Sequence, residues 1–217
     1  MIKACIFDLD GTLLYTLTSI AKAGNTVLRT FGHQEEPEEN YRFYCGDGAD
    51  KLVERILAKA GDSDPSHYEE GCRINRDVLN ANARLGARPY SGLEKTLREL
   101  KRQGILLAVC SNKPDSAVQE IIPDVFGPEL FDTVCGQKEP LRLKPAPDMP
   151  LFAAEQLGVK PEECLYLGDS GTDMKTGRAA GMTTIGVRWG YRSDEELLEN
   201  GAVRLVTEPD EILKLVE

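Results

Sequence analysis

The chain has 217 residues, of which 41% are hydrophobic and 29% charged, as is ordinary for a globular protein in water. Its formal net charge of -10 argues against general binding of nucleic acids or of anionic membrane surfaces. An anionic substrate stays possible, because a metal ion and a few lysines can invert the local field.

The first predicted element is a short buried strand, the apolar run 4–7, which ends in Asp8 and Asp10. Two carboxylates two residues apart repel each other, and each raises the other's pKa unless a cation lies between them. The pair therefore indicates a divalent metal or a shared proton. The stretch Asp-Leu-Asp-Gly is by itself equally typical of a simple turn.

The next part of the chain, from residue 16 to about residue 86, has a helical pattern and almost no strand signal. Gly-rich and Pro-containing breaks divide it into segments. The predicted helices cover residues 16–31, 41–45, 49–60 and 68–85. Thr16 lies where it can cap the first of them.

From about residue 88 onward, amphipathic helices alternate with continuous apolar strands. The predicted helices are 93–102, 114–122, 147–157, 172–180, 194–199 and 209–216. The predicted strands are 105–110, 131–135, 164–167, 183–187 and 202–206. This alternation indicates an α/β fold with a doubly wound (Rossmann-like) parallel sheet.

The helical span interrupts the alternation directly after the first strand, so we interpret it as an insertion. The predicted core domain covers residues 1–15 and 88–217, and a small all-helical cap domain covers residues 16–87. Ligands of open parallel sheets bind at the carboxyl ends of the strands. Asp8 and Asp10 are therefore expected at the binding site.

Three further strand ends carry polar residues. Ser111 and Asn112 follow strand 105–110, where they can donate hydrogen bonds to phosphate-like oxygens or merely begin the next helix. Lys144 offers a compact cation after the third strand. Asp169 and Asp173 follow the fourth strand, and oxygen ligands from two strand tips suit Mg²⁺. Acids at a helix start are also ordinary dipole stabilisers.

The pattern of cysteines and the lack of a visible targeting or membrane-spanning segment indicate a cytoplasmic protein. None of the six cysteines forms a C-x-x-C pair, so we expect buried free thiols in a reducing compartment and no structural zinc. With only His33 and His67 present, a histidine-rich metal site is not expected either. No signal peptide or bilayer-spanning run is visible.

Taken together, the strand-end residues resemble the four ordered motifs of the haloacid dehalogenase-like (HAD) phosphatases. The motifs are Asp8-Leu9-Asp10-Gly11-Thr12, Ser111-Asn112, Lys144-Pro145 and Gly168-Asp169-Ser170-x-x-Asp173. The resemblance covers essentially the whole chain, including the inserted cap. Within the family the chain most resembles phosphoglycolate phosphatases and related cap-bearing phosphomonoesterases. The residues that carry this resemblance are Gly46-Asp47-Gly48, Pro89-Tyr90-Ser91-Gly92-Leu93 and Trp189-Gly190-Tyr191.

The resemblance implies a Mg²⁺-dependent phosphatase that cleaves a small phosphate ester through an aspartyl-phosphate intermediate. Asp8 is then the nucleophile, and the side chain of Asp10 is the general acid and base. Lys144 stabilises the phosphoryl oxygens. The implied Mg²⁺ ligands are Asp8, the backbone carbonyl of Asp10 and Asp169, while Asp173 orients Lys144 or a water on the metal.

The resemblance also implies a substrate site that the cap closes. The core residues expected to bind the substrate are Thr12, Ser111 and Asn112. Lys51 on the cap is a candidate for an anionic substrate tail such as a carboxylate, or else lies on a solvated helix face. The family usually has an Asp-Ser pair where this chain has Tyr15 and Thr16, so a tyrosine replaces a carboxylate at the cap hinge.

Other activities stay open at the level of sequence. A β-phosphoglucomutase-like phosphotransferase or a pyrophosphatase shares the same core motifs. An inactive HAD-like binding or regulatory module is the non-enzyme alternative, and it would have lost at least one core group. We expect a monomer or a homodimer whose partner is a small-molecule phosphate ester, with no nucleic acid and no membrane.

Overall fold

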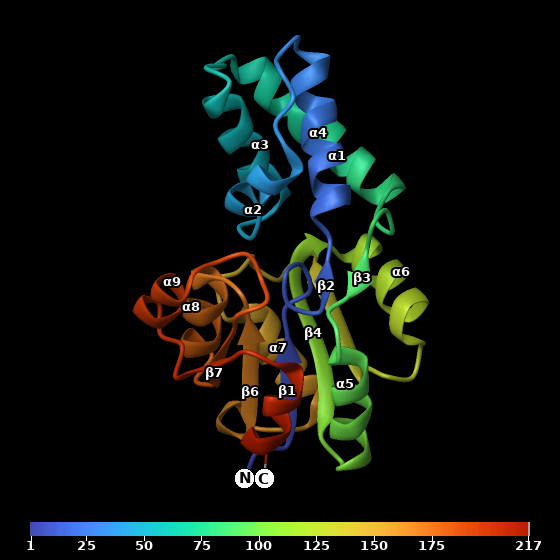
Figure 1. Ribbon diagram of the computed structural model, residues 1–217, viewed down its shortest axis with the longest axis vertical. Helices are drawn as coiled ribbons and strands as arrows, with labels where there is room; N and C mark the ends of the chain where they lie inside the picture. The colour runs from blue at the N-terminus through green and yellow to red at the C-terminus, as the bar shows by residue number, and fades with distance from the viewer. Residues whose placement is uncertain (217) are drawn as a thin grey trace.

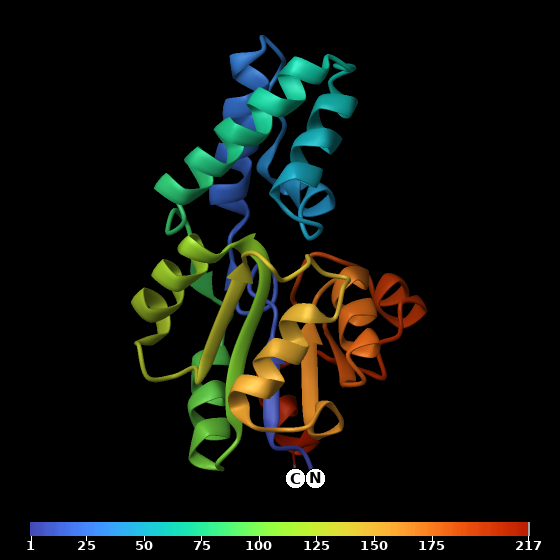
Figure 2. The same ribbon diagram turned by 180° about the vertical axis from the view of Figure 1, so that it is seen from behind.

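The computed structural model describes residues 1–216. Figures 1 and 2 show two parts along the long axis of the molecule: a sheet flanked by helices, and a group of helices beyond one end of that sheet. Both termini lie at the opposite end of the sheet (Figure 1). The inserted helices therefore lie over the edge at which strand β1 ends.

The sheet has six strands, all paired in parallel, in the order β5-β4-β1-β6-β7-β8. In chain order the strands are β1 (Ala4–Phe7), β4 (Leu106–Pro114), β5 (Thr133–Gln137), β6 (Cys164–Gly168), β7 (Thr183–Val187) and β8 (Arg204–Val206). The central strand β1 is buried on both faces, which is why it is apolar at every position. The predicted α/β class with a parallel sheet and an inserted helical region is confirmed.

Helices cover both faces of this sheet (Figures 1 and 2). The helices α5 (Leu93–Arg102), α6 (Asp115–Phe126) and η3 (Pro209–Leu215) pack on one face, and α7 (Asp148–Leu157) and α8 (Gly171–Ala179) on the other. Cys5 and Phe7 belong to the first hydrophobic cluster, whereas Ala4 and Ile6 belong to the second. Alternate side chains of β1 thus anchor two separate layers. The short helices η2 (Pro161–Glu163) and α9 (Asp194–Glu199) lie in connections.

The inserted part has its own hydrophobic core. It consists of α1 (Leu17–Thr30), η1 (Glu38–Asn40), α2 (Tyr41–Tyr44), α3 (Ala49–Lys59) and α4 (Pro65–Ala81). A Cβ atom on Gly71 of α4 would lie 3.0 Å from both Val27 and Val53. The glycine therefore lets α4 pack closely against α1 and α3.

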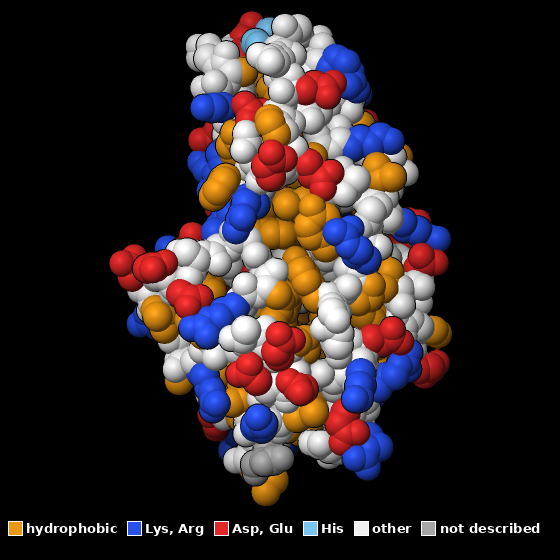
Figure 3. All heavy atoms as spheres, viewed as in Figure 1, with side chains coloured by type: hydrophobic (Ala, Val, Ile, Leu, Met, Phe, Trp, Pro, Cys, Tyr) orange, Lys and Arg blue, Asp and Glu red, His pale blue; other side chains and the backbone are white. Residues whose placement is uncertain are grey.

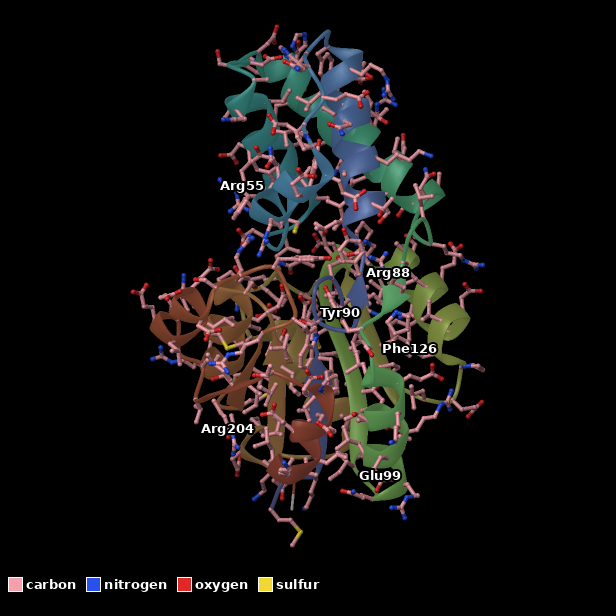
Figure 4. The ribbon with its side chains drawn as sticks, viewed as in Figure 1. Arg55, Arg88, Tyr90, Glu99, Phe126 and Arg204 are labelled. Carbon is pink, nitrogen blue, oxygen red and sulfur yellow. The ribbon has the colours of Figure 1, made fainter. Side chains whose placement is uncertain are left out.

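A two-stranded ribbon joins the two parts. Strands β2 (Leu14–Tyr15) and β3 (Arg88–Pro89) pair antiparallel, with Leu14 opposite Pro89. The Arg88 guanidinium lies 4.0 Å from the centroid of the Tyr15 ring, so a cation–π contact spans the ribbon. Arg88 and Tyr90 are labelled at this junction in Figure 4. The ribbon lies where we expected the chain to pass between the core domain and the cap domain. The exact domain bounds at residues 16 and 87 stay a prediction.

Several bounds differ from those predicted. Helix α4 begins at Pro65, because the Asp64 side chain caps it by accepting a hydrogen bond from Ser66 N at 2.8 Å. Helix α6 runs past Pro123 to Phe126, although a proline usually ends a helix. The last predicted helix is a 3₁₀ helix, η3.

The prediction that the Thr16 side chain caps the first inserted helix was wrong. Thr16 holds the N-cap position of α1, but its side chain makes no capping bond to the helix. Its backbone N–H instead donates to the Tyr191 hydroxyl at 3.1 Å. The start of α1 is thus tied to the loop that follows β7.

The state of the cysteines agrees with the prediction. All six cysteines are free and buried, as predicted. Burial raises the pKa of the Cys5 thiol above its usual value, so this side chain behaves as a small hydrophobe. A search of residues 1–216 finds no helix long and apolar enough to cross a membrane.

Candidate active site

The carboxyl ends of β1, β4 and β6 meet beneath the inserted helices (Figure 1). Asp8 directly follows β1, and its backbone N–H donates to Leu167 O of β6 at 2.9 Å. Asp169 directly follows β6, and Asp173 lies in the first turn of α8. Parallel pairing of adjacent strands thus brings these carboxylates to one edge of the sheet.

The three carboxylates form a compact buried cluster around one lysine. One oxygen each of Asp8, Asp169 and Asp173 lies within 4.8 Å of the other two. The Lys144 Nζ lies 2.7 Å from Asp8 Oδ1 and 2.7 Å from Asp173 Oδ1. The structure therefore brings together four residues predicted from separate strand ends.

The electrostatics of the cluster follow from burial and crowding. Burial and the neighbouring charge of Asp173 raise the pKa of Asp8 well above its usual value, against the lowering effect of Lys144. The same two causes raise the pKa of Asp169 to about 7. Burial alone would lower the pKa of Lys144, but the charges of Asp173 and Asp8 raise it well above its usual value.

This charge balance fits a divalent cation. When all three carboxylates are ionised, they face only one ammonium group, which leaves two negative charges without compensation. Buried charges need a partner of opposite sign, and carboxylate oxygens are hard ligands of the kind that Mg²⁺ takes. The buried aspartates can therefore hold a metal ion.

Both oxygens of Asp169 are held by the protein. Oδ1 accepts a hydrogen bond from Thr12 Oγ1 at 3.0 Å, and Oδ2 accepts one from Tyr191 N at 2.8 Å. The indole N–H of Trp189 donates to Thr12 O at 2.9 Å and fixes the loop that carries the hydroxyl. Thr12, which was predicted to contact the substrate, orients Asp169 in this structure.

Asp173 is held in the same way. Its Oδ1 pairs with Lys144, and its Oδ2 accepts hydrogen bonds from Ser170 N at 3.1 Å and Ser170 Oγ at 2.6 Å. These bonds form a capping box at the start of α8. Because both oxygens have protein partners, Asp173 is suited to orient Lys144.

The end of β4 supplies the next two predicted residues. Asn112 Oδ1 accepts from Lys144 N at 2.8 Å, and its Nδ2 donates to Lys144 O and to Gly46 O, each at 3.2 Å. Asn112 therefore fixes the segment of Lys144 and touches the inserted part. Ser111 Oγ accepts from Lys113 N at 3.2 Å, and Ser111 lines the pocket described below.

Lys113 is a buried residue that was not among the predicted site residues. Its side chain is only 2% exposed, and its Nζ lies 3.2 Å from Asp10 Oδ1. Asp10 lies apart from the three clustered aspartates and is half-buried. The signal for Lys113 was present in the sequence, since it directly follows Ser111 and Asn112 at a strand end.

A pocket with a cavity volume of about 50 Å³ lies between the two parts and opens onto Asp8 and Asp10. All of its charged lining residues within the described part of the chain belong to the sheet part: Asp8, Asp10, Lys113 and Lys144. The inserted part contributes only apolar side chains and glycines: Ile20, Cys45, Gly46, Gly48, Ala49, Leu52 and Leu79. The structure does not bring Lys51 to this pocket, since its ammonium pairs with exposed Glu54 at 2.7 Å.

Polar contacts hold the inserted part against the sheet part beside the pocket. Arg192 Nη2 donates to Cys45 O at 2.9 Å, and Arg42 Nη2 donates to Tyr191 O at 2.9 Å. The Thr172 hydroxyl donates to the Asp47 carboxylate. These contacts run from α2 or the loop after it to the first turn of α8 and the loop after β7, so they close one side of the pocket.

Comparison with known proteins adds the family. The model described as haloacid dehalogenase-like hydrolase matches residues 5–187, and the motif residues above lie within that match. The chain belongs to this family. It is accordingly a phosphatase, and the core groups that an inactive module would have lost (Asp8, Asp10, Ser111, Lys144 and Asp169) are all present.

Relatives of known name cover nearly the whole chain. Phosphoglycolate phosphatase from Neisseria meningitidis is 33% identical over 206 residues, which are 94% of this chain and 87% of that protein. A predicted phosphoglycolate phosphatase from Haemophilus somnus superposes with a TM-score of 0.90 at 27% identity, covering 100% and 98% of the two chains. CbbY from Rhodobacter sphaeroides, solved with xylulose-(1,5)bisphosphate, superposes with a TM-score of 0.80 at 28% identity, covering 97% and 96%.

Proposed function

We propose that this phosphatase is a Mg²⁺-dependent phosphomonoesterase for a small phosphorylated carboxylic acid of the phosphoglycolate type. The observation that carries the proposal is the buried Asp8, Asp169 and Asp173 cluster around Lys144, at the base of a small pocket. Relatives named phosphoglycolate phosphatase, at about a third identity over most of the chain, support the substrate class.

Asp8 is the nucleophile in this proposal. Its carboxylate attacks phosphorus in line, the ester oxygen leaves, and water later hydrolyses the aspartyl phosphate. The Lys144 ammonium, 2.7 Å from Asp8 Oδ1, favours the ionised carboxylate and can neutralise the phosphoryl oxygens. Mg²⁺, held by Asp8, the carbonyl of Asp10 and Asp169, would supply further charge neutralisation at those oxygens.

Asp10 is the general acid and base. Its side chain lines the same pocket as Asp8, where it can protonate the departing oxygen and then accept a proton from the attacking water. Lys113, 3.2 Å from Asp10 Oδ1, orients this carboxylate. Ser111 completes the core wall of the pocket and is available to donate a hydrogen bond to a phosphoryl oxygen.

Lys113 takes the role that we first gave to Lys51. Lys144 already faces two carboxylates, whereas Lys113 faces only Asp10 in the described part of the chain. The wall opposite it is apolar, so a substrate carboxylate in the pocket would bind to the Lys113 ammonium. The modest volume of the pocket favours a substrate of a few carbon atoms.

The test is a screen of Mg²⁺-dependent phosphate release over phosphoglycolate, sugar phosphates, nucleotides and pyrophosphate. We expect the highest kcat/KM for phosphoglycolate, and we expect Asp8→Asn to lose turnover while keeping its far-UV circular dichroism spectrum. Substantial activity in Asp8→Asn would refute the nucleophile. A higher kcat/KM for any other compound would refute the substrate class.

A second candidate is the removal of one phosphate from a sugar bisphosphate. It is favoured by the similarity to CbbY, whose structure holds xylulose-(1,5)bisphosphate. It comes second because the apolar wall formed by Ile20, Leu52 and Leu79 offers no cation to a second phosphate. Transfer to a sugar phosphate, as in a β-phosphoglucomutase, is distinguished by following the label of a ³²P substrate.

The proposal includes a cytoplasmic location and a monomer or homodimer. The buried free thiols support the location, because free cysteines persist in reducing compartments.

A further inference from the structure

The only two histidines of the chain meet at one carboxylate, far from the catalytic pocket. His33 follows α1, Asp62 lies in the turn between α3 and α4, and His67 lies in the first turn of α4. The distance to Asp62 Oδ2 is 2.6 Å from His33 Nε2 and 2.8 Å from His67 Nδ1. Figure 3 shows histidine and acidic side chains together at the tip of the helical part farthest from the sheet.

We propose that His33, Asp62 and His67 form a binding site for a divalent transition metal ion, with Zn²⁺ as the first candidate. Two imidazoles and one carboxylate make a donor set of the kind that zinc takes, with water in the fourth position. One ligand atom of each residue lies within 4.8 Å of the others. Ligands about 2 Å from a tetrahedral ion lie roughly 3.3 Å apart, so small side-chain shifts suffice to admit it.

The surroundings of His67 favour a metal ligand. Its second ring nitrogen, Nε2, lies 4.0 Å from the carboxylate of Asp64. If Nδ1 binds a metal through its lone pair, Nε2 carries the proton and points it toward that carboxylate, as metal-bound histidines commonly do. If a neutral ring instead donated from Nδ1 to Asp62, the Nε2 lone pair would face a second anion.

The site is also held in shape while remaining accessible. Asp62 Oδ1 accepts a hydrogen bond from Asp64 N at 3.0 Å, and its side chain is only 6% exposed. The His67 ring stacks on Phe31 with centroids 4.2 Å apart. The histidine side chains are 24% and 36% exposed, so an ion can enter from solvent. A bound ion would tie the end of α1 to the α3–α4 turn, independently of the catalytic chemistry.

The test is a titration of the full chain with Co²⁺ in millimolar Mg²⁺, followed by competition with Zn²⁺. We expect one equivalent of Co²⁺ to give a visible d–d absorption band that Zn²⁺ removes. His33→Ala and His67→Ala should each lose the band, and Asp64→Asn should weaken binding about tenfold or more. Zn²⁺ at a hundredfold excess over Kd should raise the Tm of the native chain by about 5–10 °C and leave the histidine variants unchanged.

Gln34→Ala is the matched control, because Gln34 is exposed beside His33, and it should bind Co²⁺ like the native chain. Retained Mg²⁺-dependent phosphatase activity in the histidine variants shows that they are folded. An unchanged Co²⁺ band in His33→Ala and His67→Ala would overturn the site, as would the absence of any band in the native chain.

Discussion

Asp169 carries a carboxylate whose protonation depends on whether a cation neutralises its neighbours. Burial and Asp173 raise its pKa to about 7, well above the value of about 3.9 in an unfolded chain. A raised carboxyl pKa means that the folded state holds a proton which the unfolded state releases. The metal-free protein therefore loses stability as pH rises from about 4 to about 7.

The first prediction follows from this loss of stability with rising pH. In the proposed site Mg²⁺ would bind the ionised carboxylates and remove this penalty, so it should raise Tm by about 5 °C more at about pH 8 than at about pH 5.5. Thermal melts with and without Mg²⁺ at both pH values measure the difference. Asp169→Asn is the control and should show only a small Mg²⁺ effect at either pH. An equal Mg²⁺ effect at both pH values in the native chain would contradict the assignment.

The second prediction concerns Lys113. Lys113→Met keeps the length of the side chain and removes its charge, so kcat/KM for phosphoglycolate should fall about 10–100-fold through KM, since a charged hydrogen bond is lost. Lys51→Met is the matched control and should change kcat/KM less than about twofold, because Lys51 lies on the surface beside Glu54. Steady-state kinetics with phosphoglycolate and with ethyl phosphate, which has no carboxylate, separate the two roles of Lys113. A similar loss on both substrates would assign Lys113 to orienting Asp10 alone.

At the scale of single elements, α6 shows why some bounds escape prediction. The helix was expected to end at residue 122, before Pro123, but it continues to Phe126. Ile121, Ile122 and Phe126 are buried in the main core, and their packing outweighs the local cost of a proline on the exposed side. Tertiary contacts of this kind are invisible in a local sequence window.

The third prediction uses the same helix. Pro123 is exposed and lacks the N–H that would reach the carbonyl of Gln119, so Pro123→Ala should add a hydrogen bond and relieve a steric conflict. We expect a gain of about 1 kcal/mol in the free energy of unfolding, or about 2–4 °C in Tm. Urea unfolding measures the gain, with Ser116→Ala at another exposed position of α6 as the control. A loss of stability would mean that the proline fixes the path of the chain beyond α6.

The elements that were predicted correctly show their hydrophobic pattern and their end points within their own residues. Strand β1 ends where its apolar run meets Asp8, and α5 keeps its predicted bounds because its leucines recur on one face before Gly104. The ribbon of β2 and β3 has two residues per strand, too few for any period, and it exists only because the segments meet in space. Strand β4 likewise extends to Pro114 through its pairing with Gln137.

The candidate site likewise contains residues that could be predicted from the sequence and residues that could not. Asp8, Lys144, Asp169 and Asp173 could be predicted from motifs, because parallel strands bring their carboxyl ends together whatever the details of packing. A motif does not tell which lysine points into the pocket, so the sequence indicated Lys51, whereas Lys113 lines the pocket in the structure. Lys51 misses the pocket because α3 directs its apolar face, which includes Leu52, toward it.

At the scale of the whole molecule, the two parts divide the work. The sheet part supplies every charged residue described in the pocket, and the inserted helices supply an apolar lid. The ribbon of β2 and β3 (Figure 1) and a few polar contacts near α2 connect the two. Gly46 and Gly48 have φ values of +109° and +96°, so only glycine readily follows the path of the loop between these contacts. A lid held in this way can open for product release.

The last prediction tests whether these contacts close the lid. Arg192 donates to the backbone carbonyls of Cys45 and Arg42, so Arg192→Met should favour the open arrangement by about 1–3 kcal/mol. Phosphoglycolate, which under the proposed function binds in the closed pocket, should then show a KM raised about 5–100-fold. The KM for p-nitrophenyl phosphate, which has a good leaving group, should change less than about threefold. Arg188→Met is the matched control, because Arg188 pairs with Asp194 on the surface and makes no contact with the inserted part. Arg192 also lowers the pKa of Asp169, so an equal loss on both substrates would mean that it acts through this carboxylate instead of through the lid.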